Sequence, residues 1–268
     1  SLEKKIYWLE KARKAIKKAS KKAEVIVISH YHYDHFPRPW ESVEWHRRKR
    51  ILLKDPAHMI NFSQRRRGWM FKKTAGKYAK RLEIADGKTF EFGNTKLKFS
   101  NPVFHGSENS VLGWVLMTII EYEREKFLFA SDVQGPMDNS TLKIILAEKP
   151  QLILIGGPPI YLAGFRVKNE YIQQGMKNLE SLAKNIPTTI LEHHILREKR
   201  WREFSQPIFN AASKTGHSVV TAAEFLKNKN NILEYRRKQL FETEPPSSEF
   251  NEWMKLPRPK RKLIKPPI

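Results

Sequence analysis

Three histidines and an aspartate fall within six residues, directly after a short apolar segment. The segment 24–29 contains two valines and two isoleucines, which is typical of a β-strand buried on both faces. The next residues include His30, His32, Asp34 and His35. Side chains alternate along extended chain, so His30 and His32 can bind one ion while Asp34 and His35 curl towards a neighbouring one. The cluster therefore predicts a two-metal site at a strand end, rather than an exposed histidine-rich loop.

The composition limits the chemistry of such a site. The chain has no cysteine, so each ligand must be an imidazole or a carboxylate. We expect two divalent ions, zinc first, with manganese or iron as alternatives because a carboxylate is present. No apolar run reaches the roughly 20 residues that cross a bilayer, and no signal-peptide pattern is present, so we expect a cytoplasmic protein without membrane contact. Abundant charge without cysteine would also suit a thermophile.

The remaining pattern predicts a mixed α/β chain. A strand-rich first half and a second half of alternating strands and helices indicate two mixed sheets packed face to face with helices outside, over residues 1–244. Residues 37–80 show no clear period and are expected to form loops and short helices, and 245–268 an extended, basic, proline-rich tail. We expect helices at 2–22, 139–148, 168–185, 199–214 and 222–241, hairpins at 89–100 and 114–130, and strands at 151–155 and 188–192.

The pattern His-x-His-x-Asp-His after a hydrophobic strand resembles the signature of the metallo-β-lactamase superfamily. This resemblance implies an αββα sandwich and three further metal-site residues, each at the end of a strand. The residues that match are His105, Asp132 and His193. By the resemblance, His105 completes the first metal site with His30 and His32, Asp132 bridges the two ions, and His193 is the last ligand of the second.

The last ligand is one of two adjacent histidines. The run Leu191-Glu192-His193, with Arg197 four residues on, resembles the closing motif of relatives that process the 3′ end of tRNA, which favours His193. His194 then lies behind the ligands or donates a proton, and Arg197 is the nearest arginine for a phosphate. A shift of one residue would reverse the choice, because adjacent strand side chains point to opposite faces.

Over nearly its full length the chain resembles an archaeal family of predicted metallo-hydrolases. The stretches 29–35, 60–68 and 191–197 carry this resemblance. The superfamily usually opens with a strand hairpin ahead of the first helix, whereas this chain starts at the helix. We therefore expect the first sheet to lack those N-terminal strands.

The charge balance points to a polyanionic partner. Lysine and arginine total 50 against 28 acidic residues, a formal net charge of +22. Basic clusters lie at 47–50, at 65–73 and in the tail, and the second interleaves Trp69 and Phe71 with its cations, which suits base stacking on RNA or single-stranded DNA. Each cluster alone is as well explained by a solvated charged face.

The predicted function is hydrolysis of a phosphodiester or nucleic acid by two metal ions that activate water, with Asp34, Asp132, His194 and Arg197 as catalytic residues. The alternatives are a hydrolase of small esters, lactones or phosphates, and a non-catalytic, metal-containing protein that binds nucleic acid. Three other histidines, at positions 46, 58 and 217, are expected at the surface, and no local signal decides whether Gln64 touches substrate.

Overall fold

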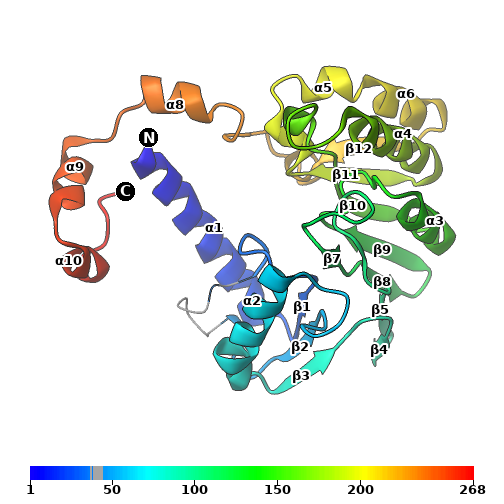
Figure 1. Ribbon diagram of the computed structural model, residues 1–268, viewed down its shortest axis with the longest axis horizontal. Coiled ribbons are helices and arrows are strands. Elements are labelled where there is room, and N and C mark those ends of the chain that lie inside the picture. Colours follow the sequence, from blue (N-terminus) through cyan, green and yellow to red (C-terminus); the bar gives the residue numbers. More distant parts are fainter. Residues whose placement is uncertain (37, 39–44) are drawn as a thin grey trace. The chain divides into compact units, whose positions relative to one another are not determined.

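The computed structural model describes residues 1–36, 38 and 45–268 (Figure 1). The chain divides into two compact units. One is formed by Ser1–Glu24 together with Leu233–Ile268, and the other is Val25–Ile232. Every sheet and every predicted metal-site residue belongs to the second unit, called here the sheet unit.

The described part of the sheet unit contains a small and a large sheet. The small sheet is parallel throughout and consists of β1 (Val25–Ile28), β2 (Arg50–Leu53) and β3 (Arg81–Ile84). The large sheet is mixed and has the order β12-β11-β10-β9-β8-β5-β4. Its strands are β4 (Thr89–Phe92), β5 (Thr95–Phe99), β8 (Thr118–Tyr122), β9 (Glu125–Ala130), β10 (Leu152–Gly156), β11 (Thr188–Glu192) and β12 (Ser218–Thr221). A separate pair joins β6 (Val103–Phe104) to β7 (Trp114–Val115).

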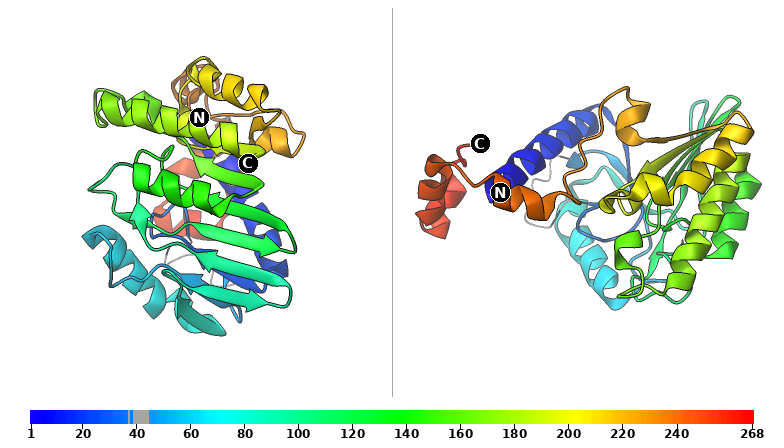
Figure 2. Two further views of the ribbon diagram at one scale, coloured as in Figure 1. Left: turned by 90° about the vertical axis from the view of Figure 1, so that its right-hand side faces the viewer. Right: turned by 90° about the horizontal axis from the view of Figure 1, so that it is seen from above.

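Helices cover the outer faces of both sheets. The small sheet carries α2 (Phe62–Lys73), followed by the 3-10 turn η2 (Ala75–Tyr78). Figure 2 shows three helices along one face of the large sheet: α3 (Asn139–Glu148), α4 (Asn169–Asn185) and α6 (Gln206–Lys214). Shorter turns complete the unit: η3 (Ile160–Leu162), η4 (Ile195–Arg197), α5 (Trp201–Phe204) and α7 (Ala222–Phe225).

The alternation of side chains along the strands explains the layers. On β1, Val25 and Val27 pack into the core between the sheets, whereas Ile26 and Ile28 pack towards Phe71 of α2. The outer face of the large sheet is covered by apolar residues of α4 and α6. The order of layers is helix, small sheet, large sheet, helices, so the predicted αββα sandwich is confirmed.

Residues 37–80 hold more regular structure than the sequence predicts. The segment forms a central strand, β2, and the three-turn helix α2, while residues 37 and 39–44 lie outside the described part of the chain. A four-residue strand is too short to show a period. The buried positions of α2 are Gln64, Gly68 and Phe71, so the helix has no apolar stripe that would reveal it.

Two helices are shorter than predicted. The helix expected at 199–214 is divided into α5 and α6, with Pro207 in the first turn of α6. The helix expected at 222–241 is wrong, because α7 ends after one turn and Lys227 takes a left-handed backbone conformation. Three asparagines at 228–231 also favour turns over helix.

The other unit is helical. Its helices are α1 (Leu2–Lys22), α8 (Arg237–Thr243), α9 (Ser248–Lys255) and α10 (Arg258–Leu263). The extended tail expected at 245–268 is therefore wrong for α9 and α10: Ser247 caps α9, and Phe250 is buried. The backbone N–H of Ser247 also donates to Glu3 of α1 at 2.7 Å. In the part of the chain that the structure describes, no helix has the length and apolar character needed to cross a membrane.

Candidate metal centre

Strand ends bring the predicted residues together from four parts of the chain. His30 comes two residues after β1, and His105 directly follows β6. Asp132 comes two residues after β9, and His193 directly follows β11. Strands β9 and β11 both run parallel to β10 and flank it, so their carboxyl ends lie at the same edge of the large sheet. The fold therefore collects side chains that are far apart in sequence, as the resemblance implies.

Asp132 is the centre of the cluster. Its carboxylate is 1 % exposed, and its backbone has a φ of 63°, a left-handed conformation that aspartate tolerates better than most residues. A conformation of this kind at a buried polar site is typical of functional residues. Five imidazole Nε2 atoms lie between 2.8 and 3.9 Å from the Asp132 carboxylate oxygens, those of His30, His35, His105, His193 and His194.

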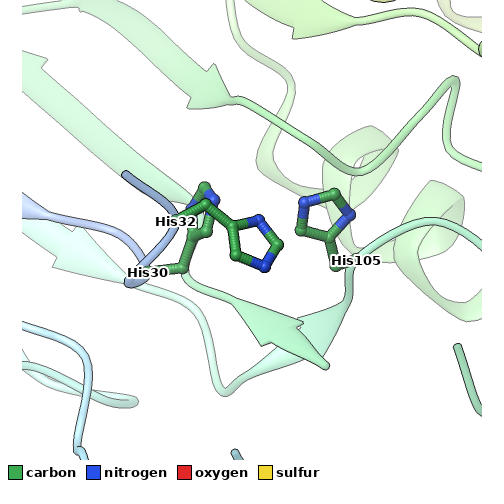
Figure 3. A group of neighbouring side chains, drawn as sticks. All are labelled: His30, His32 and His105. Carbon is green, nitrogen blue, oxygen red and sulfur yellow. The ribbon is translucent and has the colours of Figure 1, made fainter. Parts of the chain in front are cut away.

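One group of three histidines can hold an ion. Figure 3 shows His30 and His32 beside His105, and one ligand atom of each lies within 4.8 Å of the others. The Nδ1 atom of His30 lies 3.1 Å from the hydroxyl of Ser29. Its Nε2 atom is buried and has no hydrogen-bond partner among the described residues. A buried nitrogen without a partner is costly, and a metal ion would satisfy it.

A second set of groups lies on the other side of Asp132. Asp132 groups with His193 and His194, and Asp34 and His35 group with His193, each within 4.8 Å. Asp34 is the outermost member, because its side chain is 63 % exposed. The structure brings both His193 and His194 to Asp132, at 3.1 and 2.9 Å, so both stay candidates for the last ligand.

Glu192 supports this second set and was not singled out from the sequence. Its Oε2 atom lies 2.8 Å from Nδ1 of His193, and its Oε1 atom accepts a hydrogen bond from Ser131 at 3.0 Å. A carboxylate on the far nitrogen of a ligating histidine fixes the ring and makes it a stronger ligand. The signal in the sequence was the acid–histidine pair at the end of a strand, which alone is common.

Burial and hydrogen bonds together set the protonation states of the histidines and Asp132 in the cluster. Burial lowers the pKa of His30 and of His32, and it lowers the pKa of His105 to about 3, so these rings are neutral and able to bind metal. Burial also opposes charge on His193, but the hydrogen bonds to Asp132 and Glu192 prevail and raise its pKa to about 10. Burial acts to raise the pKa of Asp132, yet its hydrogen bonds from the histidines hold that pKa far below its usual range. Asp132 is therefore ionised.

Two further residues lie close to the cluster. Gln64 of α2 accepts a hydrogen bond from the backbone N–H of Tyr31 at 3.1 Å, which fixes the chain between His30 and His32. Arg197 donates to the hydroxyl of Tyr161 at 3.0 Å, and its positive charge is one of the smaller causes that lower the pKa of His194. Gln64 thus supports the ligand backbone, and Arg197 lies within electrostatic reach of the centre.

The histidines outside the motif differ in exposure. His58 is exposed, whereas the prediction for His46 is wrong, since its side chain is only 2 % exposed. The His46 ring lies 5.3 Å from that of Phe71, between centroids. Its burial belongs to the packing of α2, and it is not part of the groups that can hold a metal ion among the described residues.

The described residues fit divalent metal ions. The donor set combines buried neutral imidazoles with one ionised carboxylate placed between two groups of ligands. Imidazole and carboxylate are the ligands that zinc, manganese and iron accept in the absence of thiolates.

One solved structure resembles this fold with a TM-score above 0.5. A mutant of the CmlA beta-hydroxylase matches 74 % of this chain with a TM-score of 0.51 at 12 % identity, although the matched part is only 42 % of that protein. A metal-dependent hydrolase of the beta-lactamase superfamily matches 73 % of this chain and 74 % of its own, with a TM-score of 0.42 at 14 % identity. At these identities the likeness is one of fold.

Curated relatives are closer in sequence. No family model matches the chain. A UPF0282 protein of Korarchaeum cryptofilum is 37 % identical over 248 residues, which covers 92 % of this chain and 80 % of the relative. A UPF0282 protein of Thermococcus sibiricus is 39 % identical over 247 residues, or 88 % of this chain and 78 % of the relative. With this identity over most of both chains, the protein belongs to the UPF0282 family.

Proposed function

We propose that this protein is a metal-dependent hydrolase that cleaves phosphodiesters with two divalent ions, zinc in the first instance. The observation that carries the proposal is the buried carboxylate of Asp132, which lies between two groups of imidazole ligands. A structural zinc site is usually closed by four ligands around one ion, whereas this arrangement offers ligands on both sides of one carboxylate.

Each residue has a role in this proposal. His30, His32 and His105 would hold one ion, while His35, His193 and Asp34 would hold the other, and Asp132 would contact both. When bound, the ions supply a nucleophilic hydroxide at neutral pH and polarise the bond to be cleaved. His194 and Arg197 would act on the substrate itself.

The two substrate-directed residues are argued from their positions. His194 holds its Nε2 atom 2.9 Å from Asp132 and can deliver a proton to a leaving oxygen. The positive charge of Arg197 acts on His194, and a guanidinium can bind two phosphate oxygens at once. Together they favour a phosphate-containing substrate over a neutral ester or lactone.

The excess of positive charge favours a polymeric phosphodiester. A formal net charge of +22 attracts polyanions, and binding of nucleic acid releases the counterions that surround its phosphates. We therefore propose RNA or single-stranded DNA as the natural class of substrate.

The test combines metal analysis with a small substrate. The purified protein should contain about two zinc, manganese or iron ions per chain and hydrolyse bis-para-nitrophenyl phosphate. Asp132→Asn should reduce both the metal content and the rate, the rate by at least about a hundredfold. Glu203→Gln, on the exposed side of α5, is the matched control and should change neither. Turnover of a lactone panel with no phosphodiesterase activity would contradict the proposal.

A further inference from the structure

Helix α2 has an unusual exposed face. Phe62, Arg65, Arg66, Trp69 and Lys73 lie within about 100° of one another around the helix axis, at 100° per residue. Phe62 is 81 % exposed and Trp69 is 43 % exposed, although large aromatic side chains usually anchor a helix to the core. These five residues are called here the α2 face.

The α2 face is positively charged without local compensation. The helix sequence contains no acidic residue. Among the described residues no ion pair joins Arg65 or Arg66 to an acid. The ammonium of Lys72 lies 4.6 Å from the centre of the Trp69 ring, so the charge is concentrated at the aromatic side chain.

The opposite side of α2 is fastened to the metal-binding motif. Gln64 accepts a hydrogen bond from the backbone N–H of Tyr31. Arg67 donates a hydrogen bond to the backbone carbonyl of Tyr31 at 3.2 Å. Gly68 allows a close approach, because a Cβ atom there would lie 2.8 Å from the Tyr31 ring. Tyr31 stands between His30 and His32, so the helix is held directly against two candidate ligands.

Two parts of α2 contact segments that carry candidate ligands. The guanidinium of Arg67 lies 4.5 Å from the centre of the Tyr33 ring, next to His32 in the chain. At the N-terminal end, Asn61 and Gln64 donate to the backbone of the loop that follows His105, at Val111 and Leu112. Helix α2 therefore contacts the motif and the loop after His105 through its buried side and its N-terminal end, and the α2 face lies on the other side of the same helix.

We propose that the α2 face binds a single-stranded polynucleotide on the helix whose other side is fastened to the metal-binding motif; this rests on the proposed phosphodiesterase function. Phe62 and Trp69 are seven residues apart, about 10 Å along the axis at 1.5 Å per residue. That separation corresponds to about three nucleotides of a stacked strand at 3.4 Å each. The aromatic rings stack on bases, and Arg65, Arg66 and Lys73 bind the intervening phosphates.

A duplex is the occupant that this face disfavours. Its bases are already stacked and paired, so Phe62 and Trp69 could not reach their flat sides without unstacking. In a single strand the bases are available, and every base offers a face for stacking. The proposal thus predicts a preference for single strands with little dependence on sequence.

Direct binding tests the proposal without relying on cleavage. Fluorescence anisotropy would follow binding of labelled 12-nucleotide phosphorothioate strands, in RNA and DNA forms, and of the matching duplex to the protein as purified. Phe62→Ala/Trp69→Ala should weaken strand binding at least about tenfold with little change in its salt dependence. Arg65→Ala/Arg66→Ala should weaken strand binding by a similar factor at low salt. It should also make the slope of the logarithm of the binding constant against the logarithm of the salt concentration shallower by about 1–2.

The matched control removes two charges from the far side of the sheet unit. Lys143 of α3 and Lys184 of α4 are exposed, and these helices cover the large sheet, whereas α2 covers the small one. Lys143→Ala/Lys184→Ala should leave strand binding within about twofold of the parent. The proposal would be overturned if the control variant lost as much strand affinity as the α2-face variants, or if Phe62→Ala/Trp69→Ala bound strands as tightly as the parent. It would also be overturned if the parent bound the duplex as tightly as the single strand, or bound neither.

Two further measurements, zinc content and the rate with bis-para-nitrophenyl phosphate, distinguish this proposal from the proposed function. All three double variants should keep the parent's zinc content and its rate with bis-para-nitrophenyl phosphate, because none of them alters a candidate ligand. If the parent binds strands through the α2 face but hydrolyses no phosphodiester, the proposed function is wrong, whereas the proposal that the α2 face binds single strands is supported. Tighter binding of the RNA or of the DNA strand identifies the natural polymer and supports the proposal in either case.

Discussion

At the scale of single residues, Glu192 illustrates how a candidate ligand is oriented. Its carboxylate holds His193 through Nδ1 and leaves Nε2 directed at Asp132. Glu192→Gln keeps the shape but removes the charge that favours a strongly basic ring. We expect the affinity for zinc to fall about 10- to 100-fold, measured by titration against a competing chelator. Glu203→Gln again serves as the control, and an unchanged affinity in Glu192→Gln would show that the contact does not support the ligand.

His46 provides a pH-dependent prediction away from the candidate ligands. Burial lowers its pKa to about 4, whereas in the unfolded chain the pKa is about 6.5. Between these values the unfolded state binds a proton that the folded state does not, so stability falls as the pH drops from about 6.5 to 4. His46→Phe has no group that takes up this proton, so the variant does not lose stability in this way. The difference in unfolding free energy between variant and parent should therefore grow over that range in urea titrations and stay constant below it. A difference independent of pH would contradict the assignment.

At the scale of elements, the strands before the candidate ligands and the long helices were predicted, whereas α2 was not. The Val/Ile run at 24–29 marks a buried strand, and the strand before Asp132 was predicted as part of the hairpin at 114–130. The helices at 2–22 and 139–148 were predicted with the observed bounds. Helix α2 was missed because it docks through Gln64, Gly68 and an aromatic ring, so its function in holding the motif leaves no apolar period. The cluster from His30 to His35 followed from its own spacing, and His105, Asp132 and His193 followed from a resemblance. The roles of Gln64, Arg67 and Glu192 are seen only once the fold brings distant segments together.

Gly68 tests how closely α2 must approach the motif. A Cβ atom at this position would lie 2.7 Å from Cβ of Pro56 and 2.8 Å from the Tyr31 ring. Gly68→Ala should therefore destabilise the sheet unit by about 1–3 kcal/mol in urea unfolding, despite the better helix propensity of alanine. Ser63→Ala, at an exposed position of the same helix, should stay within about 0.5 kcal/mol of the parent. A Gly68→Ala protein as stable as the parent would mean that the helix is not pressed against Tyr31.

At the scale of the whole molecule, the candidate metal centre replaces apolar packing at one edge of the two-sheet core. The edge where β9 and β11 end contains a buried carboxylate and several buried imidazoles in place of packed hydrocarbon. Without ions, the charge of Asp132 is balanced by His193, whose raised pKa keeps it protonated, whereas burial keeps His30 and His105 neutral. The stability of the sheet unit should therefore depend on the occupant of this edge, because a bound cation compensates the carboxylate and satisfies the unpartnered nitrogen of His30.

Removal of metal should consequently lower the melting temperature of the sheet unit. A ligand that binds only the folded state at 100 times its dissociation constant adds about 2.7 kcal/mol, and in a unit of this size that corresponds to about 5–10 °C. Calorimetry of protein dialysed against a chelator, then supplied with increasing zinc, should show the melting temperature rise with the zinc concentration. Asp132→Asn should show a smaller rise, because its carboxamide cannot compensate a cation. If zinc did not change the melting temperature, or raised it equally in Asp132→Asn, this prediction would be wrong. The stability of the sheet unit would then not depend on metal bound at Asp132.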